Sequence, residues 1–146
     1  MLSKSCRYGI RAVIYLADRV EEESILGIKQ ISEDLKLPTP FLAKILQQLA
    51  KNKILNSVKG PHGGFSLLKD PAEITLFDLV RIIDGEEVLT NCLIHTESCR
   101  SVGIEKKQCP IHDDYSAIRN LLIEFFQNNT IADIVKRSKS NSDVII

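Results

Sequence analysis

The chain of 146 residues is long enough for one ordinary domain, or for a small domain with an added dimerisation element. Its 44% hydrophobic and 26% charged residues argue against a disordered or fibrous chain, and its 5% aromatic residues, with no Trp, disfavour a β-sandwich. The formal net charge of zero excludes a histone-like polycation, but residues 1–70 hold 11 basic and 7 acidic residues and residues 71–146 hold 8 and 12.

The first part of the chain predicts three helices. Apolar residues at helical spacing predict a helix over about 5–20, buried on more than one side, and a short helix over about 28–35. Thr39 stands before Pro40, a pair typical of an N-cap and first helical position, and predicts a third helix over about 40–52. In this helix we expect an inward side and an outward side, formed by Phe41, Leu42, Ile45, Leu46 and Leu49 and by Lys44, Gln47, Gln48 and Lys51, respectively.

A β-hairpin is expected next. The apolar residues of positions 54–58 and 65–68 predict two strands, and the glycine-rich stretch 59–64 predicts the turn between them. Residues 74–83 predict a helix with Thr75 as its cap and Gly85 as its stop, and residues 86–111 predict no regular element. A long helix over about 113–128 follows, and Thr130 is expected to cap a short helix through Val135, before a frayed end at 136–146.

No segment approaches the roughly 20 apolar residues that a membrane span needs. The first residues also lack the hydrophobic stretch of a signal peptide. We therefore expect a cytoplasmic protein without a membrane partner, in which cysteines stay reduced.

A helix, a turn, a second helix and a glycine-rich hairpin are the layout of a winged helix-turn-helix. The chain is thus expected to be mainly α, with a small β-hairpin wing and a long C-terminal dimerisation helix. Six lysines and no acidic residue stand between Asp34 and Asp70, namely Lys36, Lys44, Lys51, Lys53, Lys59 and Lys69. Such a stretch can be a solvated basic face, but together with the layout it predicts double-stranded DNA as a partner.

Three cysteines and a histidine gather in the late part of the chain, as Cys92, Cys99, Cys109 and His112. Thiolates and an imidazole can hold zinc or an iron–sulfur cluster. On a straight helix Cys92 and Cys99 would lie about 10.5 Å apart, so the segment must curl if both bind one small centre. The alternatives are three buried cysteines without a ligand, or a different fourth ligand from among Cys6, His95, Glu97 and Asp113.

Tyr115, Ile118, Leu122 and Phe125 recur at spacings of three and four in the long helix. Two heptads are too short to establish a coiled coil, so this stripe either packs on its own domain or forms a dimer interface. Winged domains of this size commonly double their DNA contacts by forming two-fold dimers.

Several stretches of the chain resemble one known family. They are residues 2–4 (LSK), 7–9 (RYG), 31–33 (ISE), 58–67 (VKGPHGGFSL) and 129–135 (NTIADIV). The sequence resembles the Rrf2 family of bacterial winged-helix transcription regulators, especially its iron–sulfur cluster regulators, over about residues 2–136. His62 departs mildly from the family pattern, in which another glycine is common.

The resemblance implies a set of DNA contacts. The helix from Thr39 would enter the major groove, the wing would touch the minor groove, and the first helix would approach phosphates. The implied residues are Ser3, Lys4, Arg7, Tyr8, Thr39, Lys44, Gln47, Gln48, Lys59, His62, Gly63 and Gly64. Phe41 would also lie at or near the major groove unless it belongs to the core.

The resemblance also favours an iron–sulfur cluster over zinc at Cys92, Cys99, Cys109 and His112. A 2Fe–2S cluster with His112 as the last ligand is favoured, and a 4Fe–4S cluster is left open because the cysteine spacing is wider than usual in the family. The resemblance implies a homodimer in which the long helices pair in an antiparallel or crossed arrangement.

We hypothesise a homodimeric, promoter-binding transcription regulator controlled by an iron–sulfur cluster that senses redox state, nitric oxide or iron–sulfur status. Its expected parts are a winged helix-turn-helix domain at 1–85, a cluster-binding loop at 86–112, and a dimerisation helix and tail at 113–146. The alternative is a metal-binding carrier or interaction protein without DNA function, which explains the cysteines but not the lysines or the wing. Cys109 and His112 could act as nucleophile and base, but no third orienting group stands out, so we expect no enzyme.

Overall fold

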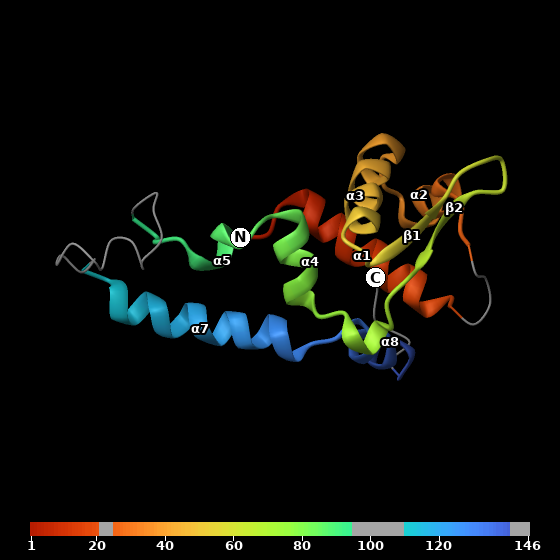
Figure 1. The fold of residues 1–146 in the computed structure, drawn as a ribbon. Coiled ribbons are helices and arrows are strands. Elements are labelled where there is room, and N and C mark those ends of the chain that lie inside the picture. The colour runs from red at the N-terminus through yellow and green to blue at the C-terminus, as the bar shows by residue number, and fades with distance from the viewer. Residues whose placement is uncertain (21–24, 95–109, 141–146) are drawn as a thin grey trace.

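The computed structural model describes residues 1–20, 25–94 and 110–140 (Figure 1). Within them the chain is mostly helical, with one two-stranded antiparallel sheet, as predicted. In chain order the elements are α1 Lys4–Asp18, α2 Ile28–Leu35, α3 Thr39–Lys51, β1 Leu55–Val58, β2 Gly64–Leu67, the 3-10 turn η1 Pro71–Glu73, α4 Leu76–Ile83, α5 Glu87–Thr90, α7 His112–Asn128 and α8 Ile131–Ser140.

The core forms around α1, which packs against α3, α4 and α8. Its residues 12–16 are all buried, which confirms a helix covered on more than one side. Gly9 allows the closest approach, because a Cβ at this position would lie 2.4 Å from the Ile83 side chain and 3.1 Å from that of Ile45. The helices α1, α3 and α4 therefore meet directly at a glycine.

The turn between α2 and α3 is held by polar contacts. The Lys36 backbone is left-handed with φ 53°, and the Leu37 N–H donates to the Ser32 carbonyl at 2.9 Å. The Ser32 hydroxyl donates to the Leu37 carbonyl at 2.6 Å and pairs with the Thr39 hydroxyl at 2.7 Å. Two predictions are wrong here. Thr39 is the first residue of α3 and not its N-cap, which is Pro38, because the Thr39 hydroxyl is paired with that of Ser32. Phe41, predicted to point inward, is 58% exposed.

The hairpin β1–β2 is the predicted wing, with Leu55 opposite Leu67 and Val58 opposite Gly64. A third backbone segment joins it, because Leu26 and Phe65 exchange N–H···O bonds of 2.9 and 2.8 Å. A Cβ at Gly64 would lie 2.0 Å from the Leu26 carbonyl oxygen, and one at Gly63 would lie 2.1 Å from the Val58 carbonyl oxygen. Both glycines are thus required where the wing backbone folds closely on itself and on residue 26.

The second half of the chain attaches to the same body. Thr75 caps α4 through a reciprocal capping box with Asp78, as its position predicted, and Gly85 follows with φ 85°. Residues 87–90 form α5, so the expectation of no regular element at 86–111 is wrong there. Thr130 forms a similar reciprocal pair with Asp133, and α8 runs on to Ser140 rather than ending at residue 135.

Figure 1 shows α7 extending away from the α1–α4 body, with α5 beside it. The Asn128 end of α7 lies at the body, where Thr75 and Thr130 form a bridge and α8 packs against α1 and η1. None of the described helices is long and apolar enough to cross a membrane. The division into parts at 1–85, 86–112 and 113–146 stays a prediction.

Candidate nucleic-acid interface

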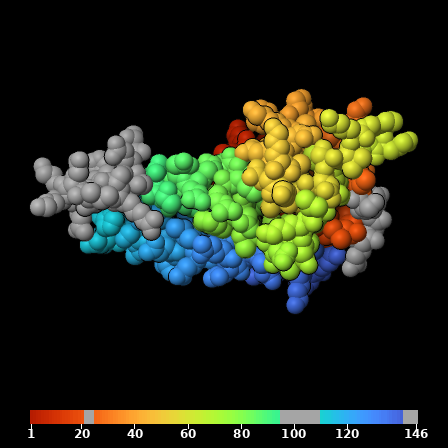
Figure 2. Space-filling model, viewed as in Figure 1, coloured from red at the N-terminus to blue at the C-terminus, as the bar shows by residue number. Residues whose placement is uncertain are grey.

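The outer face of α3 and the tip of the wing carry exposed polar side chains. Lys44 and Gln47 are exposed on α3, and Lys59 and His62 are exposed on the hairpin turn. Figure 2 shows the wing, in yellow, projecting beside α3. This arrangement gives a convex helix and a thin hairpin on one side of the molecule, which is a shape that fits two neighbouring grooves of a duplex.

Two predicted contacts on α3 are turned toward the protein. The Gln48 side chain is half-buried, and its amide nitrogen donates to the Ile82 carbonyl oxygen of α4 at 2.5 Å. Thr39 is half-buried, with its hydroxyl paired to Ser32. In this structure both residues therefore position α3, while Lys44 and Gln47 are exposed, the Gln47 amide donating to the Ser57 hydroxyl of β1 at 3.3 Å.

The N-terminal candidates fall into two kinds. Lys4 and Arg7 are exposed and Tyr8 is half-buried. Ser3 caps α1 by accepting the Cys6 N–H at 3.0 Å, and its own N–H donates to the Asp84 carboxylate at 2.8 Å. The Ser3 hydroxyl also donates to Asp84, so Ser3 joins the start of α1 to the end of α4.

The acid-free stretch forms a basic surface. Five of its six lysines are exposed, and Lys69 is half-buried. The ion pairs found in the described parts of the chain involve Arg19, Arg81 and Lys139, and none involves these six lysines. Cations that are solvated and not neutralised by protein carboxylates are the ones that can displace counterions from DNA.

The cysteine segment is described at its two ends. Cys92 is half-buried just after α5, and His112 is half-buried as the first residue of α7. The two helices are in contact, and the Arg119 guanidinium donates to the Thr90 carbonyl oxygen at 3.4 Å. Cys99 and Cys109 lie outside the described residues, as does the alternative ligand His95. The fold thus brings the segment that carries Cys92 alongside the helix that begins with His112.

Cys6 has the environment of a packing residue. Cys6 lies on α1 and is 0% exposed, and burial, with a smaller contribution from Asp84, raises the pKa of its thiol to about 12. Such a thiol is neutral at physiological pH and is a poor metal ligand where it lies.

The predicted apolar stripe of α7 is divided between the protein and solvent. Leu122 is half-buried against the core, where Phe126 is buried, and Tyr115 is half-buried with the Arg119 guanidinium 5.8 Å from the centre of its ring. Ile118, Leu121 and Phe125 are 64%, 67% and 53% exposed. Leu121, which with Phe126 widens the predicted stripe, lies on the same side of the helix as Ile118 and Phe125. These three side chains form what we call the α7 apolar face.

Comparison with known proteins gives a consistent picture. The Rrf2 family, described as iron-dependent transcriptional regulators, matches residues 2–137. A protein of Aquifex aeolicus (strain VF5), provisionally named an HTH-type transcriptional regulator, is 31% identical over 135 residues that cover 92% of this chain and 91% of that protein. The HTH-type transcriptional regulator IscR of Serratia proteamaculans (strain 568) is 27% identical over 99% of this chain and 82% of its own length. The solved structure of CymR, the global cysteine regulator of B. subtilis, shares the fold with a TM-score of 0.75 at 23% identity, covering 94% of this chain and 97% of that one.

Proposed function

Because the chain belongs to the Rrf2 family of transcriptional regulators, we propose that it binds promoter DNA as a homodimer and that an iron–sulfur cluster controls this binding. The coarser part is given by the family: the chain is a DNA-binding, winged-helix transcription regulator and not an enzyme. The finer parts are the DNA contacts, the dimer and the cluster, and each has its own support and test.

The DNA contacts rest on one observation, the exposed polar face of α3 beside a lysine-bearing wing. Lys44 and Gln47 contact base edges or phosphates in the major groove, and Lys59 and His62 at the wing tip contact the adjacent backbone. Lys4 and Arg7 lie exposed at the start of α1 and add phosphate contacts. Gln48 and Thr39 act indirectly, through their bonds to α4 and α2.

The test is the salt dependence of DNA binding. A duplex selected by the protein from a random-sequence library is titrated by fluorescence anisotropy at several salt concentrations. In a dimer the Lys44→Ala/Lys59→Ala variant loses four lysines, so the slope of log K against log salt should become shallower by about 3 to 4. The matched control, Lys136→Ala/Lys139→Ala, removes as many exposed lysines from α8 and should leave the slope unchanged. Equal slopes for the two variants would contradict this interface.

The homodimer is supported by the α7 apolar face. Three large apolar side chains on one side of a helix are unusual in contact with water, and a two-fold partner presenting the same face would cover them. The face lies on the helix that follows the cysteine segment. A dimer built here joins the two copies next to the proposed cluster sites.

The donor set fits an iron–sulfur cluster. Three thiolates and one imidazole are ligands of such clusters. The two members in the described residues, Cys92 and His112, are both half-buried, the first just after α5 and the second at the start of α7, and these two helices are in contact. Cys92, Cys99 and Cys109 would hold the cluster, and His112 would complete its ligands. When bound, the cluster supplies a centre whose charge and ligands respond to redox state and to nitric oxide.

The chain offers a short connection between this segment and the DNA-binding elements. Cys92 follows α5, which follows α4 after Gly85, and α4 contacts α3 through the Gln48–Ile82 bond. Asp84, at the end of α4, also holds the start of α1 through Ser3. A change in the position of the cysteine segment would thus act on α4 and, through it, on α3 and α1.

The cluster is tested by anaerobic purification. Iron and acid-labile sulfide are measured per chain, with the visible spectrum before and after reduction. We expect both elements in the wild-type protein and loss of the visible absorbance in single Cys92→Ala, Cys99→Ala and Cys109→Ala variants. Cys6→Ala is the matched control and should keep the absorbance. A coloured triple variant, or bound zinc without sulfide, would refute the cluster assignment.

A further inference from the structure

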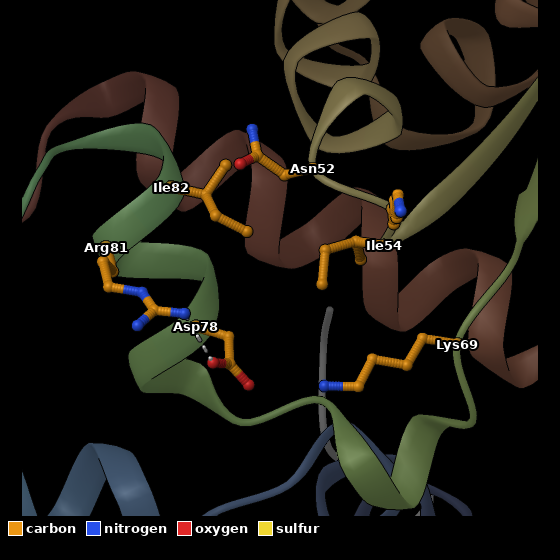
Figure 3. Close-up of a pocket in the computed structure, with 7 residues that line it drawn as sticks. Asn52, Ile54, Lys69, Asp78, Arg81 and Ile82 are labelled. Atoms are coloured by element: carbon orange, nitrogen blue, oxygen red, sulfur yellow. Dashed lines mark ion pairs between the residues drawn. The ribbon is translucent and has the colours of Figure 1, made fainter.

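A cavity of about 490 Å³ lies where α3, the wing and α4 meet. The end of α3 contributes Asn52 and Lys53, the wing contributes Ile54 and Lys69 at its two base positions, and α4 contributes the remaining side chains. Figure 3 shows Lys69 extending its amine toward α4, and the Arg81 guanidinium beside Asp78. The cavity is of ordinary size for a small-molecule site, for which about 300–1,000 Å³ is typical.

The cavity carries an excess of positive charge. Lys53, Lys69 and Arg81 line it together with one carboxylate, that of Asp78. This carboxylate is already engaged, because it accepts from the Thr75 N–H and hydroxyl at 3.1 and 3.0 Å and lies 3.6 Å from Arg81. The two lysines have no carboxylate partner in the part of the chain that the structure describes. A small anion would therefore find two ammonium groups without a carboxylate partner, whereas the Arg81 guanidinium is already paired with Asp78 at 3.6 Å and with Glu86 at 4.0 Å.

The backbone at Lys53 gives independent support. Helix α3 ends in a Schellman motif, in which Ile54 N–H donates to the Leu49 carbonyl and Lys53 N–H donates to the Ala50 carbonyl. The left-handed position of this motif, with φ 60°, is held by Lys53 although glycine is the residue that adopts it without strain. Lys36 is also left-handed, at the end of α2, but Lys53 is the one of the two that lines the cavity.

We propose that this cavity binds the phosphate group of a small organic phosphate monoester. The two charges of a dianionic phosphate match the two lysine ammonium groups that line the cavity. The cavity is much larger than one phosphate group, and Ile54 and Ile82 offer apolar contact to the organic part of the ligand. The site goes beyond the proposed DNA contacts and cluster ligands, although its Lys53 and Lys69 belong to the acid-free lysine stretch described above.

A phosphate of the DNA backbone has the same chemistry and must be distinguished. The cavity lies on the side of α3 where Gln48 bonds to α4, whereas Lys44 and Gln47 are exposed on the outer face. The cavity also includes the buried Ile54, although Lys53 and Arg81 at its wall are exposed. These features favour a free ligand over DNA.

The test maps backbone amide shifts in phosphate-free chloride buffer without DNA. Ribose 5-phosphate at up to about 10 mM should give saturable shifts at residues 52–54 and 81–82, and ribose alone should give none. The Lys53→Gln/Lys69→Gln variant should bind at least about ten-fold more weakly, while the matched Lys136→Gln variant binds as the wild type does. Retained amide dispersion establishes that each variant is folded.

Three results would overturn the proposal. They are the absence of saturable shifts with both ribose 5-phosphate and inorganic phosphate, equal affinity in the double variant, and shifts elsewhere in the protein. A further arm measures the salt dependence of DNA binding. If Lys53→Gln/Lys69→Gln lowers that slope by about 0.9 for each lysine, the cavity binds the DNA backbone and the proposed ligand is wrong. An unchanged slope supports a free phosphate ester.

Discussion

The α7 apolar face makes a quantitative prediction about assembly. Complete burial of a large aliphatic or aromatic side chain contributes about 1.5–3 kcal/mol relative to exposure. Ile118, Leu121 and Phe125 are 64%, 67% and 53% exposed, so each has somewhat more than half of that still to gain in a dimer. Two copies place six such side chains in one interface, which together contribute on the order of 6–10 kcal/mol to association.

Truncation of all three to Ala should remove most of this contribution. The Ile118→Ala/Leu121→Ala/Phe125→Ala variant keeps strong helix formers in α7, so its fold should be intact. We expect its dimer dissociation constant to rise by at least about a thousandfold, which corresponds to roughly 4 kcal/mol. Sedimentation equilibrium over a wide concentration series measures this constant, and circular dichroism checks the helix content.

A control on the same helix separates apolar burial from general effects of alanine. Asn120, Glu124 and Gln127 are exposed on the polar side of α7, and their triple alanine variant should dimerise as the wild type does. The reasoning fails if the two triple variants have the same dissociation constant, or if the wild-type protein is a monomer at every concentration.

Three smaller changes test local parts of the fold by urea denaturation. Gly64→Ala puts a Cβ 2.0 Å from the Leu26 carbonyl oxygen and should lower the free energy of unfolding by about 1–3 kcal/mol. In the control Gly27→Ala the new Cβ meets nothing nearer than 3.9 Å, so the free energy of unfolding should fall far less. Lys53→Gly relieves a left-handed backbone and should raise that free energy by about 1 kcal/mol; a decrease would contradict strain at this position. Burial raises the pKa of the Cys6 thiol from 9.0 to about 12, so the stability due to the neutral thiol is present below pH 9.0 and declines as the pH rises toward 12. The Cys6→Ala variant should lack this alkaline decline in the free energy of unfolding. Identical pH profiles for the variant and the wild type would refute the prediction.

Periodicity located the elements because burial imposes it. The residue spacing predicted α2 and α3, the wing and α4, and the structure places all of them within one or two residues of expectation. The prediction that Phe41 points inward is wrong because this residue lies at about 90° from the centre of the inward stripe of α3, where hydrophobicity alone does not distinguish core from surface. The prediction that Thr39 is the N-cap of α3 is wrong because its hydroxyl is hydrogen-bonded to that of Ser32, seven residues earlier. That contact exists only once α2 and α3 have packed.

The short helix α5 and the cavity could not be predicted from the sequence because both depend on contacts between distant parts of the chain. One turn of helix at 87–90 is too short to show a periodic pattern, and its position depends on contacts with α7. The cavity combines Lys53, Lys69 and Arg81, which are separated by 16 and 12 positions. They meet only because α3 ends in a left-handed residue and the hairpin returns its second strand to the first.

The six lysines between Asp34 and Asp70 accordingly form more than one surface. If all six contacted DNA in each protomer of a dimer, their share of the salt slope would be about 11. The structure places Lys53 and Lys69 at the cavity, away from the outer face of α3. The remaining four can contribute at most about 7. A neutral chain with a basic first half thus divides its positive charge between a convex surface suited to a duplex and a concave one suited to a small anion.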